Sequence, residues 1–131
     1  MTPLVPFPSG TVLWVAAGGA LGAAIRFGLG EVLRGSPYAD RFPWATLVIN
    51  VTGALVLGWF MRWTSGIEVT PQVRAFVAIG VCGGYTTFST FALENLALLQ
   101  GGQVAKALLH AVLSVVLSVG AAWLGWTLGK P

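Results

Sequence analysis

The sequence predicts an all-α membrane protein with four transmembrane helices, on three observations. Of its 131 residues, 56% are hydrophobic and only 8% are charged, whereas soluble domains carry about 25% charged residues. The mean hydropathy is +0.82. Finally, four apolar stretches each reach the ~20 residues that a helix needs to cross ~30 Å of hydrocarbon. The length allows one domain, which we expect to span residues 1–131.

The four stretches are separated by short linkers that contain turn residues, which favours antiparallel neighbours. They run from Thr11 to Leu33, from Ala45 to Trp63, from Gln72 to Leu99 and from Gln103 to Leu128. The first is too long for the apolar region of a signal peptide, and no Lys or Arg precedes Arg26. We therefore expect it to remain as a helix of the mature protein.

The first stretch carries one internal cation. Arg26 follows Gly18 and Gly22 at intervals of four, so the three residues share a helical face. The glycines permit close helix packing. Arg26 could extend to the nearer membrane interface, or it could place positive charge near the entrance of an anion pathway.

The second stretch places Thr46, Asn50 and Gly53 on one face. Asn50 stands among apolar residues, where an amide side chain is costly unless it contacts protein or water. It could join two helices by a hydrogen bond, or it could donate to a permeating anion.

The third stretch is longer than the membrane requires, since its residues would extend about 42 Å as a straight α-helix. Gly83 and Gly84, followed by Thr86 and Thr87, predict a break in this helix at mid-membrane. Broken spanning helices occur where the freed backbone groups bind an ion, line a cavity or are covered by protein. Glu94, two turns after Thr87, could couple to protons or cap a polar vestibule.

The fourth stretch has His110, Ser114 and Ser118 at strict intervals of four. A serine hydroxyl can bond to its own helix, but a row of polar groups indicates a wetted face. His110 has no partner ligands in a metal-binding pattern, and its role is left open.

The positive charges do not favour either orientation in the membrane. With four spans, one side would hold Arg62, Arg74 and Lys130, and the other would hold Arg34, Arg41 and Lys106. The positive-inside rule therefore gives no preference. The tie predicts that copies insert both ways up and form an antiparallel homodimer.

Other function classes lack support in the sequence. There is no nucleophile–base pair and no pair of carboxylates, so we do not expect an enzyme. No basic cluster predicts binding to nucleic acid. The single cysteine, Cys82, excludes an intrachain disulfide.

Three motifs together resemble the small bacterial fluoride channels, the Fluc or CrcB family. They are "GGYTTFSTF" at Gly83–Phe91, "ATLVIN" at Ala45–Asn50 and "GGALGAAIRF" at Gly18–Phe27. The length, the four spans and the order of the motifs also fit. The resemblance implies a multi-pass protein of the bacterial inner membrane that exports fluoride passively as an antiparallel, dual-topology homodimer.

The resemblance also implies roles for particular residues. A structural sodium ion would be held by the backbone carbonyls of Gly83 and Thr86 from both copies. Phe88 and Phe91 would contact fluoride through their ring edges, which carry partial positive charge. Asn50 would donate to the ion, Ser114 and Ser118 would line a polar track, and Arg26 would support the vestibule. Thr87 and Glu94 are weaker candidates for that track.

Two other functions remain as alternatives. A small multidrug exporter coupled to protons needs an acid at the centre of its first span, and Glu31 lies at the end of that span. A membrane assembly subunit without transport would use its glycines and hydroxyls only to pack helices. Fluoride flux, drug-driven proton flux or no flux would separate the three functions.

Overall fold

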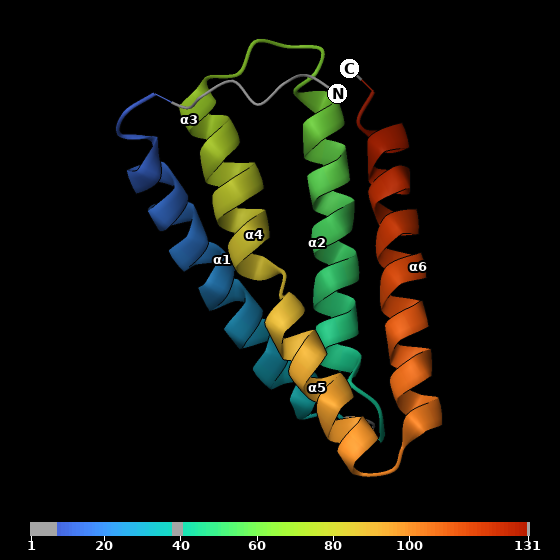
Figure 1. Cartoon of the computed structure of the whole chain (residues 1–131). Coiled ribbons are helices and arrows are strands. Elements are labelled where there is room, and N and C mark those ends of the chain that lie inside the picture. Colours follow the sequence, from blue (N-terminus) through green and yellow to red (C-terminus); the bar gives the residue numbers. More distant parts are fainter. Residues whose placement is uncertain (1–7, 38–40, 131) are drawn as a thin grey trace.

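The computed structural model describes residues 8–37 and 41–130, which form helices and no strand (Figure 1). The elements in order are α1 (Thr11–Arg34), α2 (Trp44–Trp63), α3 (Pro71–Arg74), the π-helix η2 (Ala75–Val81), α4 (Cys82–Tyr85), α5 (Phe88–Gln100) and α6 (Val104–Leu128). Because α3 to α5 follow one another over Pro71–Gln100, four segments are long and apolar enough to cross a membrane. The four predicted spans are confirmed to within one residue at each end.

Local chemistry explains several helix ends. The Thr70 hydroxyl accepts a hydrogen bond from the Val73 N–H, and Pro71 occupies the first turn of α3, where its missing N–H costs nothing. At the other end of this span, Gly102 has φ 71°, a left-handed conformation that favours glycine. It allows the chain to turn from α5 into α6 within a few residues.

The third span departs from α-helical geometry at two places. The first is η2, a run of π-helix that the sequence did not predict. The second is Thr86 (φ −77°, ψ 158°) and Thr87 (φ −148°, ψ 118°), which are extended between α4 and α5. Gly83 and Gly84 lie just before them and are still helical.

Glycines allow the spans to approach closely in two pairs. A Cβ at Gly18 would collide with the carbonyl oxygen of Phe76, and one at Gly22 with that of Val81, so α1 packs tightly on η2 and α4. A Cβ at Gly125 would likewise collide with the carbonyl oxygen of Leu55, which brings α6 against α2. The close packing predicted for Gly18 and Gly22 is confirmed.

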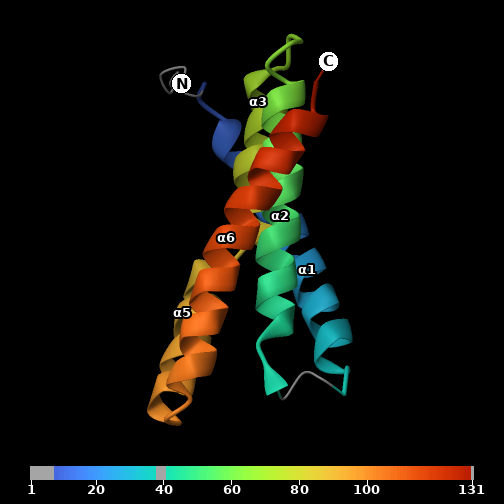
Figure 2. The same ribbon diagram turned by 90° about the vertical axis from the view of Figure 1, so that its right-hand side faces the viewer.

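The second half of the third span takes a different direction from the first. Figure 2 shows α5 running beside the first half of α6, and both lean away from α1 and α2. Large apolar side chains are exposed on all four spans, and Phe88 at the start of α5 is 79% exposed. Such a surface suits hydrocarbon or a second copy of the chain rather than water.

Candidate functional site

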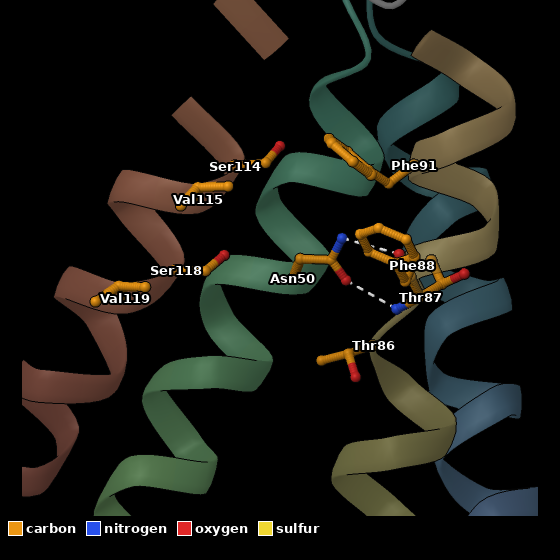
Figure 3. Close-up of a pocket in the computed structure, with 9 residues that line it drawn as sticks. All are labelled: Asn50, Thr86, Thr87, Phe88, Phe91, Ser114, Val115, Ser118 and Val119. Atoms are coloured by element: carbon orange, nitrogen blue, oxygen red, sulfur yellow. Dashed lines mark hydrogen bonds between the residues drawn. The ribbon is translucent and has the colours of Figure 1, made fainter. Parts of the chain in front are cut away.

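Asn50 connects α2 to the extended residues of the third span. Its Oδ1 accepts a hydrogen bond from the Thr87 N–H at 2.8 Å, and its Nδ2 donates to the Thr87 carbonyl at 3.0 Å (Figure 3). The interpretation that Asn50 joins two helices is therefore confirmed. One of the two amide hydrogens on Nδ2 is not needed for this pair of bonds, so Asn50 keeps a donor.

This pairing also explains how α4 ends and α5 begins. The Thr87 N–H would reach the Gly83 carbonyl if the helix continued, and Asn50 holds it instead. The last turn closes one residue earlier, where the Thr86 N–H donates to the Cys82 carbonyl at 3.0 Å. The Thr87 hydroxyl then accepts from the Thr90 N–H at 3.2 Å and caps α5.

A cavity of about 350 Å³ lies beside Asn50, and we call it the first cavity. Figure 3 shows Asn50 from α2, the serines from α6 and the phenylalanines from α5 arranged around it. It is lined by Asn50, Thr86, Thr87, Phe88, Phe91, Ser114, Val115, Ser118 and Val119. None of these side chains carries a charge, and six of them are residues that the sequence predicted for the pathway.

Two aromatic rings form one wall of the first cavity. The centroids of Phe88 and Phe91 lie 5.4 Å apart, with an angle of 38° between the ring planes. Their spacing of three on α5 brings the rings to one face, as predicted. Ring edges there can approach an anion that has lost its water.

Two hydroxyls form the opposite wall. Ser114 is buried, and its Oγ has no hydrogen-bond partner among the described residues. Ser118, one turn later on α6, lines the same cavity. The predicted polar face of the fourth span is therefore present at these two positions.

Glu94 lies outside the first cavity. Its Oε1 accepts a hydrogen bond from the Thr46 hydroxyl at 2.8 Å, and its Oε2 is buried without a partner. It lines a second cavity of about 520 Å³, together with Arg34, Arg41, Phe42, Pro43, Trp44, Ala45, Ala97, Leu98, Gln103 and Lys106. The second cavity is basic and contains Glu94 as its acid, in contrast to the uncharged first cavity.

Arg26 lines neither cavity. It lies half-buried on α1, one turn after Gly22 on the face that packs against α4. The role predicted for Arg26 in a vestibule stays a prediction, and the cations that line the second cavity are Arg34, Arg41 and Lys106.

Gly83 and Thr86 offer backbone oxygens near the extended residues. The Gly83 carbonyl lacks its helical donor because the Thr87 N–H is bonded to Asn50. A Cβ at Gly83 would meet nothing within 4 Å, and the residue is exposed. Among the described residues, no group of three His, Cys, Asp or Glu could hold a metal ion. The backbone carbonyls of Gly83 and Thr86 are hard oxygen donors.

Sequence reasoning missed one residue of the polar network and left another without a role. Asn95 on α5 bonds to His110 on α6, with 3.0 Å between Asn95 Nδ2 and His110 Nδ1. His110 was noticed for its spacing with Ser114, but Asn95 was not. A polar residue one position after Glu94 on a spanning helix was the available signal.

A protein-family model matches most of the chain. The family model described as "CrcB-like protein, Camphor Resistance (CrcB)" matches residues 13–126. The chain belongs to the CrcB-like family. The match extends across all four spans and contains every residue that lines the first cavity. This CrcB-like chain is thus a multi-pass membrane protein.

Relatives of the CrcB-like chain are similar over most of their length. A protein of Thermus thermophilus is 48% identical over 117 residues, covering 89% of this chain and 93% of its own. One of Rhodospirillum rubrum is 46% identical over 118 residues, covering 88% and 91%. One of Flavobacterium psychrophilum is 39% identical over 121 residues, covering 92% and 97%. All three are named "Fluoride-specific ion channel FluC".

Proposed function

We propose that this protein is a fluoride-selective channel that exports cytoplasmic fluoride passively across the bacterial inner membrane. The observation that carries the proposal is the first cavity, which gathers an amide, two serine hydroxyls and two aromatic rings around a space without charge. The names of the relatives supply the identity of the ion.

The chemistry of the first cavity suits fluoride. The ion is small and holds its water tightly, so a pathway must replace that water with closely spaced donors. The free N–H of Asn50 and the hydroxyls of Ser114 and Ser118 are such donors. Phe88 and Phe91 add ring edges, and no fixed cation is present to trap the ion.

The basic second cavity fits an entrance for anions. Positive side chains at a cavity mouth raise the local concentration of anions and speed their capture. Arg41 and Lys106 supply this charge together with Arg34, which also forms an ion pair with Glu31, while Glu94 is bonded to Thr46 beside them. Fluoride would then pass from the second cavity to the first.

We further propose that two copies assemble in opposite orientations around a structural sodium ion. The Gly83 carbonyl is released from the helix by Asn50, and the space around Gly83 is open. With Thr86, each copy would offer two hard oxygen donors, and a symmetric pair would offer four. Sodium at this point would hold the interrupted spans of both copies together.

The exporter function is less well supported by the same residues. Glu31, the acid of the first span, is exposed at the end of α1 and forms an ion pair with Arg34. Glu31 is therefore already paired with Arg34, and it lies far from the centre of the span. A drug site of the kind that exchanges protons for cations would need a central acid.

The export function can be tested in cells. The protein is expressed in a bacterium that lacks its own fluoride exporter, and growth is followed with increasing fluoride in mildly acidic medium. We expect resistance to fluoride with no change in resistance to a lipophilic cation such as ethidium. Resistance to ethidium alone would support the exporter, and resistance to neither would support the assembly subunit.

A further inference from the structure

A hydrogen bond between two hydroxyl groups joins α4 to α2. The Tyr85 hydroxyl lies 2.8 Å from the Oγ of Thr52. The Thr52 hydroxyl also donates to the carbonyl oxygen of Val48, on its own helix, at 2.7 Å. A carbonyl oxygen can only accept, so the single hydrogen of Thr52 serves that bond. The Tyr85 phenol is therefore the donor to Thr52.

The end of α4 fits closely against its neighbouring helices. A Cβ at Gly53 on α2 would collide with the Thr86 methyl group and would press on the Tyr85 ring. A Cβ at Gly84 would collide with the carbonyl oxygen of Gly19 on α1. The tyrosine ring is thus already packed on α2 through its carbon atoms, and its hydroxyl adds a directed bond to that contact.

Tyr85 lies between the two residues whose carbonyls we have proposed for sodium. Gly83 comes two positions before it, and Thr86 comes directly after it. Thr87, the next residue, is held to α2 by its two hydrogen bonds with Asn50. The interrupted segment is therefore bonded to α2 at two points, and a shift of the segment along α2 would break one bond or the other.

We propose that Thr52 and Tyr85 are positioning residues for the structural sodium ion. Their hydrogen bond holds the carbonyls of Gly83 and Thr86 at the spacing that the ion requires. The inference rests on the sodium site of the proposed function, and it assigns a role to two side chains that act through the backbone of their neighbours. Donors that are already in place bind more tightly, because no free energy is spent on ordering them when the ligand arrives.

Thermal unfolding at rising sodium concentration separates positioning from packing. The purified protein is heated in detergent with sodium chloride, and N-methyl-D-glucamine chloride keeps the ionic strength constant. A ligand that binds only the folded protein raises Tm once its concentration passes Kd. Tyr85→Phe removes only the hydroxyl, and the same rise in Tm should then need about tenfold more sodium, the ratio that one hydrogen bond gives. A Tm lowered equally at every sodium concentration would overturn the proposal.

Substitutions at Thr52 supply the second variant and the controls. Thr52→Val removes the acceptor and should shift the sodium dependence as Tyr85→Phe does, and the double variant should shift it no further. Thr52→Ser keeps the hydroxyl and should behave as the wild type. Thr127→Val makes the valine substitution on α6, where the hydroxyl donates to the Leu124 carbonyl of its own helix, and should leave the sodium dependence unchanged. Additive shifts in the double variant would contradict a shared role.

The wild-type protein distinguishes failure of this proposal from failure of the proposed function. If sodium stabilises it no more than potassium does, the sodium site is wrong and the positioning role is wrong with it. If sodium stabilises the wild type and Tyr85→Phe keeps the same sodium dependence, only the positioning role is wrong. If the sodium dependence shifts as expected but the wild type releases no fluoride from liposomes, the channel function fails and the positioning role stands.

Discussion

Asn50 shows how one side chain can shape the backbone and also line a cavity. It holds the N–H and the carbonyl of Thr87, and through them it keeps the helical donor away from Gly83. It also lines the first cavity with one amide hydrogen to spare. The two interpretations that the sequence left open for this residue are therefore compatible.

We expect Asn50→Asp to suppress fluoride flux by about tenfold or more, because hydrogen bonds to charged groups are worth about 1.5–3 kcal/mol. The carboxylate has no hydrogen to donate, and its charge repels fluoride. It would also face the Thr87 carbonyl in place of a donor. Fluoride efflux from liposomes measures the change, and gel filtration checks that the assembly is intact. Gln72→Glu, the same charge change at the end of the third span, should conduct normally.

A substitution at Phe88 can separate a role in the proposed fluoride pathway from a role in helix packing. Phe88→Ile keeps the bulk of the residue but removes the ring edge, so we expect fluoride flux to fall about tenfold. Phe27→Ile is the matched control, because Phe27 is 67% exposed on α1 and lines neither cavity. Equal fluoride flux in both variants would remove Phe88 from the pathway.

At the scale of the element, the four spans and the place where the third departs from a helix were predictable, whereas the π-helix η2 was not. Span limits follow from long apolar runs bounded by turn residues, which are local features. The π-helix η2 carries the same apolar pattern as an α-helix, so no sequence signal marks it. Asn95 on α5 contacts His110 on α6. This contact depends on how the two helices pack against each other, so no local feature of the sequence predicts it.

The glycines of α1 give a prediction about helix packing. Gly22→Ala places a Cβ against the Val81 carbonyl oxygen, and we expect a loss of about 1–3 kcal/mol in stability. Gly28→Ala adds the same methyl group where nothing lies within 4 Å, and its better helix propensity should stabilise the protein by up to about 1 kcal/mol. Thermal unfolding in detergent measures both. A Gly22→Ala protein as stable as Gly28→Ala would show that α1 and η2 can separate without cost.

At the scale of the whole molecule, the charge tie predicts that both orientations occur. Cysteine is placed at Gln103, in the turn between α5 and α6, in a Cys82→Ala background. An impermeant thiol reagent applied to intact cells should label one fraction of the protein, and a second fraction should react only after permeabilisation. Ser65→Cys, in the loop between α2 and α3, should give the same result. Labelling of one site wholly from outside and the other wholly from inside would show a single orientation.

Fluoride efflux from liposomes containing the purified protein tests the central claim most directly. Liposomes are loaded with potassium fluoride or potassium chloride. Valinomycin carries potassium out with the anion, so that no membrane voltage builds up and stops the release. An ion-selective electrode follows the anion released. The cavity of uncharged donors predicts rapid release of fluoride and little release of chloride. Equal release of both anions, or release no faster than from liposomes without protein, would contradict the account.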